Sequence, residues 1–175
     1  MPPGAPLLKS KTLGPVQAIL YGTLAVSTLD ALDAIIFFGV RGVRAARIFQ
    51  AIASGLLGRA AFDGGTRTVM LGVGLHYFIA LSIVCTYSIA SRRIPLLLNR
   101  PLISGVTYGV MVYGVMNLIV IPLSAVSRGP MSGAVILNGL LIHAAGVGLP
   151  SAMFAHWGNE GGWPEGRANR GVVRV

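Results

Sequence analysis

Four polar residues recur at helical spacing inside an otherwise apolar stretch near the N-terminus. They are Thr23, Ser27, Asp30 and Asp33. Steps of three or four residues place side chains on one face of an α-helix. The two aspartates are the only charged residues between Lys11 and Arg41, so the run 16–40 is long enough to cross a bilayer. A carboxylate inside such a span is costly to desolvate and therefore marks a candidate functional site.

Imidazole and amide side chains occur in the apolar runs further along the chain. They are His76, Asn117, Asn138 and His143. Carboxylates and imidazoles that lie together can share protons or hold a cation, and the residue types do not specify a metal ion. The structural alternative is that hydrogen bonds among these groups only fix the register of packed helices.

The composition places the chain among membrane proteins. Of its 175 residues, 54% are hydrophobic and 11% are charged, and the mean hydropathy is +0.73. A soluble domain carries about 25% charged residues. The net charge of +9 comes from basic residues that sit mainly between apolar runs, which indicates contact with anionic lipids rather than nucleic acid. The single cysteine, Cys85, excludes an intramolecular disulfide.

Four apolar runs are long enough to span a membrane as helices. They cover residues 16–40, 68–91, 102–126 and 132–155. The segment 44–62 carries Arg47 and Arg59 too close together for a span, and it predicts an amphipathic helix in the membrane interface. A re-entrant hairpin is the alternative for this segment.

Short connections between the spans predict an up-and-down arrangement. The fold class expected is therefore an all-α integral membrane protein, a four-helix bundle with an interfacial amphipathic helix between spans one and two. The domain covers residues 15–155, with an N-terminal tail at 1–14 and a flexible C-terminal tail at 156–175.

This topology brings the polar residues of all four spans to one depth. Asp33 lies 8 residues before Arg41, and His76 lies 9 residues after Arg67. At ~1.5 Å per residue, the polar groups lie roughly 12 to 22 Å below the same membrane face. We therefore predict one buried polar cluster, made of Asp30, Asp33, His76, Asn117, Asn138 and His143. Within it, we expect the two carboxylates to face away from lipid and to meet His76 and His143.

The basic residues at the ends of the spans predict contacts with lipid headgroups. They are Arg41, Arg44, Arg47, Arg59, Arg92 and Arg93. If the N-terminus is inside, eight Lys and Arg residues face the cytoplasm and six face outward, which favours cytoplasmic termini. The tyrosines in the spans are interpreted as interface or packing residues; they are Tyr77, Tyr87, Tyr108 and Tyr113.

Signatures of soluble enzymes are absent from the sequence. It has no phosphate-binding Walker loop, no HExxH, no paired CxxC, no CxxCH and no GxSxG. We therefore expect no enzymatic activity and no cofactor. One cofactor alternative remains open, a b-type haem held by His76 and His143 as axial ligands.

Several segments together carry a resemblance to a known family. They read LDALDAIIFFGVRG, RIFQAIASGLLGRAAFDGG, GLHYFIA, YSIASRR, YGVMVYGVMNLIVIPLSA and NGLLIHAAGVGLP. In these segments, over about residues 28–150, the chain resembles the YagU-like family of small bacterial inner-membrane proteins, whose members are mostly uncharacterised. The resemblance implies a bacterial inner-membrane location and a loose link to acid tolerance. It supplies no mechanism and no functional residues.

Three classes of function remain open from the sequence. The first is a multi-pass protein of the bacterial inner membrane that handles protons or cations through the buried cluster, or assists acid and stress tolerance. The second is a structural or accessory subunit of a larger membrane complex or homo-oligomer, and the third is the haem protein. In every case the bilayer and its anionic lipids are the expected partners.

The interfacial reading of 44–62 predicts that Val40 and Gly65 lie on the same side of the membrane. Reporter domains fused after each of these positions should therefore report the same compartment, and a fusion after Asn99 should report the opposite one. Opposite compartments for positions 40 and 65 would show that the segment crosses the bilayer.

Overall fold

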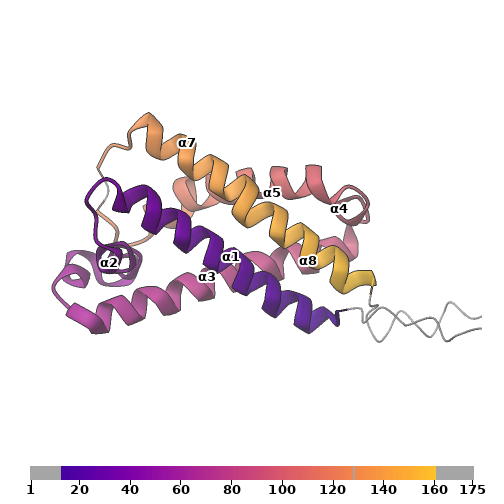
Figure 1. Ribbon diagram of the computed structural model, residues 1–175, viewed down its shortest axis with the longest axis horizontal. Coiled ribbons are helices and arrows are strands. Elements are labelled where there is room, and N and C mark those ends of the chain that lie inside the picture. The colour runs from indigo at the N-terminus through magenta and orange to yellow at the C-terminus, as the bar shows by residue number, and fades with distance from the viewer. Residues whose placement is uncertain (1–12, 128, 161–175) are drawn as a thin grey trace, which may run out of the picture.

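The computed structural model describes residues 13–127 and 129–160, and this part of the chain is helical with short connections (Figure 1). No β-strand occurs in it. The elements in chain order are α1 (Pro15–Gly39), α2 (Ala45–Leu57), the 3₁₀ segment η1 (Gly58–Phe62), α3 (Gly65–Arg93), α4 (Leu96–Asn99), α5 (Pro101–Val115), the π-helical η2 (Met116–Val120), α6 (Ile121–Leu123), α7 (Gly133–Ile142), the π-helical η3 (His143–Gly148) and α8 (Leu149–Glu160).

Four continuous helical stretches are long and apolar enough to cross a membrane. They are Pro15–Gly39, Gly65–Arg93, Pro101–Leu123 and Gly133–Asn159. The prediction of an all-helical protein with four such helices is therefore confirmed. Local sequence explains where three of them begin, because Pro15 and Pro101 occupy first-turn positions that need no amide hydrogen. At the fourth, the Ser132 side chain accepts a hydrogen bond from the Val135 amide.

The four stretches alternate in direction along the long axis of the molecule (Figure 1). Helix α1 packs against α3 and α8, and α5 packs against η3 and α8. Helix α2 packs on α3 and is seen almost end-on at one end of the molecule, opposite the end where α1 begins and α8 ends.

Large apolar side chains lie mostly on the outside of this structure. Leu20, Leu24, Phe78 and Leu118 are exposed, while the polar Ser27 is fully buried. The buried apolar clusters between the helices are small. One consists of Val26, Ala80, Val84, Val112 and Val147, and the other of Tyr87, Ala152 and Ala155. Such an inverted distribution is typical of helices that face lipid, as in a multi-pass membrane protein.

Glycines allow the closest helix contacts. A Cβ atom on Gly109 of α5 would clash with the carbonyl oxygen of His143, and one on Gly72 of α3 would clash with the carbonyl oxygen of Phe49 in α2. Gly105 and Gly148 meet in the same way. The repeated small residues of the sequence thus lie where backbones approach each other.

Each π-helical segment ends two residues before a proline. Pro122 follows η2 and Pro150 follows η3. Proline lacks an amide hydrogen, and its ring crowds the carbonyl four residues earlier, which here is Leu118 or Gly146. A wider π turn at that carbonyl accommodates the proline within a continuous helix. A π turn therefore precedes Pro122, and the helix ends at Leu123.

The element boundaries differ from the expected ones at two places. The fourth stretch continues as α8 to Glu160, so residues 156–160 are helical rather than part of a tail. Tertiary packing explains the extension, because Gly158 lies against Ala18 near the start of α1. The third stretch ends at Leu123, and Ala125 in the following loop donates its amide hydrogen to the Gly55 carbonyl of α2 at 2.9 Å. The rest of the two predicted tails, 1–12 and 161–175, lies outside the described residues.

Replacing Gly109 by alanine should destabilise the protein, because the new methyl group would force α5 away from η3. Over-packing of this kind costs about 1–3 kcal/mol. Gly114→Ala is the matched control in the same helix, since nothing lies within 4 Å of the position of its Cβ atom. The control should be neutral or stabilising by roughly 0.5–1 kcal/mol. Thermal unfolding in detergent measures both, and equal melting temperatures for the two variants would contradict the close packing of α5 on η3.

Candidate functional site

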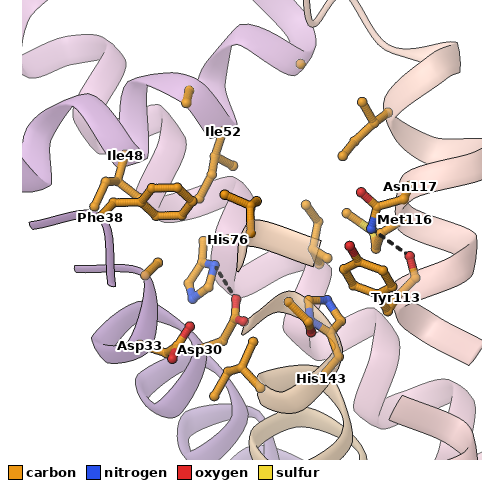
Figure 2. Close-up of a pocket in the computed structure, with 18 of the residues that line it drawn as sticks. Asp30, Asp33, Phe38, Ile48, Ile52, His76, Tyr113, Met116, Asn117 and His143 are labelled. Atoms are coloured by element: carbon orange, nitrogen blue, oxygen red, sulfur yellow. Dashed lines mark hydrogen bonds and ion pairs between the residues drawn. The ribbon is translucent and has the colours of Figure 1, made fainter. Parts of the chain in front are cut away.

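A partly open cavity of about 610 Å³ lies between the two halves of the helical domain. Its walls come from α1, α2 and α3 on one side and from α5, η2, α7 and η3 on the other (Figure 2). The six residues of the sequence-predicted polar cluster all line it: Asp30, Asp33, His76, Asn117, Asn138 and His143. The remaining lining is mostly apolar and includes Phe38, Ile48, Ile52 and Met116.

The Asp30 carboxyl group and the His76 ring face each other across the α1–α3 interface. The Asp30 Oδ2 atom lies 3.9 Å from His76 Nδ1, and Figure 2 shows this contact inside the cavity. The other ring nitrogen, Nε2, lies 2.9 Å from the Ser27 carbonyl oxygen. Because a carbonyl only accepts, Nε2 carries a hydrogen and donates it to Ser27. The ring atom of His76 that can exchange a proton with Asp30 is therefore Nδ1.

Asp33 has a different partner from the one expected. The Asn138 Nδ2 group donates a hydrogen bond of 2.7 Å to Asp33 Oδ2, which joins α1 to α7. The sequence hypothesis had both carboxylates meeting histidines. The structure gives the imidazole to Asp30 and the amide to Asp33, because three residues of helix separate the two side chains and turn Asp33 toward α7. Both carboxylates face the cavity.

The opposite wall carries His143, Asn117 and Tyr113. His143 Nδ1 lies 2.9 Å from the Gly139 carbonyl oxygen, so Nδ1 is the protonated nitrogen and Nε2 is left as an acceptor. The Asn117 side chain donates to the Tyr113 carbonyl at 2.8 Å. His143 opens η3 and Asn117 lies within η2, so both side chains come from π-helical segments, which are often found at functional sites.

Sequence reasoning assigned Tyr113 to packing, whereas the structure places it in the wall of the cavity. Its ring contacts the His143 ring with centroids 5.3 Å apart. Among the described residues, its buried hydroxyl group has no hydrogen-bond partner. The signal that points to it is its position four residues before Asn117, on the same helical face.

Arg47 also lines the cavity, although the sequence predicted a headgroup contact for it. Its guanidinium lies 4.3 Å from the centre of the Phe62 ring and donates to the Phe62 carbonyl at 3.2 Å. Arg41 stacks on the Phe37 ring at 3.6 Å and donates to the Phe37 carbonyl. The six arginines predicted to meet headgroups are all exposed, and their contact with lipid stays a prediction.

The geometry does not suit the haem alternative. One nitrogen of His76 donates to Ser27 and the other faces Asp30, so neither is directed at an iron position shared with His143. In residues 13–127 and 129–160, no three His, Cys, Asp or Glu side chains converge in the way that a metal-ion site requires.

No protein-family model, no curated protein and no solved structure matches this chain.

The hydrogen bonds predict opposite tautomers for the two cavity histidines. His76 should carry its hydrogen on Nε2 and His143 on Nδ1 when both rings are neutral. Nitrogen-15 NMR of histidine-labelled protein in detergent distinguishes the two forms, with His76→Gln and His143→Gln supplying the assignments. His156, in α8 and outside the cavity lining, is the internal reference. The same tautomer at both cavity histidines would contradict this geometry.

Proposed function

We propose that this chain is an integral membrane protein that transfers protons across the bilayer by way of a chamber open to one face, with Asp30 and His76 as the exchanging pair. In this proposal the four long helices cross the membrane up and down, and α2 lies in the interface. The crossing direction of α2 and its exposed apolar residues Leu56 and Leu57 support the interfacial position.

The observation that carries the proposal is the hydrogen bond between His76 Nε2 and the Ser27 carbonyl oxygen. Because Nε2 donates to the Ser27 carbonyl, the proton balance of the pair is confined to Nδ1 and the Asp30 carboxylate. With one proton between them, the pair is either imidazolium with carboxylate or imidazole with carboxylic acid. Removing that proton leaves a carboxylate facing a lone pair in a poorly solvated span, and adding another leaves an unpaired imidazolium. Both changes alter the electrostatics of the chamber.

Further ionisable groups line the cavity around the pair. Asp33 lies on the same helix, His143 on η3, Tyr113 on α5 and Arg47 on α2, and all four line the same cavity. The Asp30 carboxyl group and the His143 ring line the same cavity from opposite walls. A proton at the pair is therefore coupled to charge on the opposite wall, as a protein that handles protons or cations requires.

The proposed location is the bacterial inner membrane, with both termini in the cytoplasm. The bias of Lys and Arg toward the loop between α3 and α5 and toward the terminal segments supports this orientation. The cavity lies at the α2 end, so it would open away from the cytoplasm. Acid outside the cell would then reach Asp30 and His76 directly, which fits a role in acid tolerance.

Proton movement can be measured with purified protein in liposomes that contain a pH-sensitive dye. With an imposed membrane potential, wild-type protein should acidify or alkalise the lumen faster than empty liposomes. Asp30→Asn removes the exchanging carboxylate at almost the same volume and should abolish the difference. Asp63→Asn is the matched control, because Asp63 is exposed after η1 and lies outside the cavity lining. If wild-type liposomes behave like empty ones, an accessory or structural role becomes the better proposal.

A further inference from the structure

The cavity is much larger than proton exchange requires. Its volume of about 610 Å³ falls within the range of roughly 300–1,000 Å³ that is usual for small-molecule sites. Proton transfer between Asp30 and His76 needs only the 3.9 Å gap between them. The additional space is bounded by apolar side chains of α1 and α2, including Phe38, Ile48 and Ile52 (Figure 2).

The charges on the walls favour a positively charged occupant. Two carboxylates, Asp30 and Asp33, face the cavity from α1. Within the described part of the chain, their side-chain partners are one imidazole and one amide, and no lysine or arginine pairs with them. The nearby Arg47 is engaged by the ring and carbonyl of Phe62. The α1 wall therefore offers more negative charge than the described side chains neutralise.

The far wall offers hydrogen-bonding groups that the protein leaves unused. The buried Tyr113 hydroxyl has no partner among the described residues, and His143 presents its second nitrogen as an acceptor because Nδ1 donates to Gly139. A buried hydroxyl without a hydrogen-bond partner destabilises the folded protein, because water no longer satisfies it. A polar group of a bound molecule in the cavity would remove this cost.

We propose that the cavity binds a lipophilic organic cation, with its charge against Asp33 and Asp30, its apolar body against α2, and a polar substituent, where present, toward Tyr113. The inference rests on the proposed function for its link to protons, since cation and proton compete for the same carboxylates. His76, His143, Arg47 and Tyr113 are the other titratable groups that face this site.

Charge selectivity is the sharpest test, and tetraphenylphosphonium and tetraphenylborate provide it. The two ions have nearly the same size and shape but opposite charge. In equilibrium dialysis with the full chain in non-ionic detergent, the phosphonium should bind and the borate should not. Binding should weaken as the buffer is acidified, because protons then occupy the carboxylates. Equal binding of both ions would overturn the proposal and reduce the cavity to an apolar void.

Variants separate the cation site from the proton pair. Asp33→Asn should weaken phosphonium binding at least about tenfold, as expected for loss of a partly buried charge contact, and the Asp63→Asn control should bind like wild type. Ile52→Trp should block binding by filling the cavity, without touching either carboxylate. If Asp33→Asn fails to fold, Ile52→Trp supplies the test. Unchanged affinity in a folded Asp33→Asn protein would overturn the proposal.

Tyr113→Phe tests the far wall. It should leave tetraphenylphosphonium binding unchanged and weaken binding of propranolol, an amine that carries a hydroxyl group. Equal loss for both ligands would overturn the proposed contact with Tyr113.

The liposome assay distinguishes this inference from the proposed function. Proton movement that depends on Asp30, without charge-selective binding, would overturn only the cation site. Charge-selective binding that depends on Asp33, without proton movement, would support the cation site and overturn the proposed function.

Discussion

The hydrogen bond from His76 to the Ser27 carbonyl ties α3 to α1 and determines what the cavity can do. It links the buried end of the polar stripe on α1 to a ring whose other nitrogen meets Asp30. A ring held at one nitrogen only would be able to rotate, and Asp30 would then lack a fixed partner in the apolar interior. The position of the carboxylate, the protonated nitrogen and the width of the α1–α3 interface all follow from this bond.

The opposite wall is held by backbone contacts rather than by polar side chains. Gly105 and Gly109 let α5 approach η3 until its backbone meets that of His143 and Gly148. Prolines then widen both helices into π turns at Asn117 and His143, and this local widening aims the two side chains at the cavity. The glycines permit the close contact between α5 and η3, and the π turns before the prolines orient Asn117 and His143. This wall is therefore positioned without a large apolar core.

Much of the site was predictable because helix spacing and membrane depth are simple functions of residue number. The distances of Asp30, His76, Asn138 and the others from the flanking arginines suffice to place six polar residues in one layer. Their pairing was not predictable, because whether Asp33 meets an imidazole or an amide depends on helix rotation, which depth does not specify. The π turns and the extension of α8 to Glu160 were missed for a related reason. They depend on contacts between helices, such as that of Gly158 with Ala18.

The two walls of the cavity carry different kinds of polar group, which is why the proposed proton exchange and the proposed ligand binding can share one chamber. Negative charge resides on α1, in direct contact with groups from α3 and α7, while the unpaired hydroxyl and acceptor nitrogen reside on α5 and η3. A molecule that spans the cavity touches both walls, whereas a proton touches only one. Since the two walls belong to different helix pairs, occupancy by the larger molecule also biases how α5 and η3 sit relative to α1 and α3. In the proposed function, the release of a proton from Asp30 would therefore depend on what else the cavity contains.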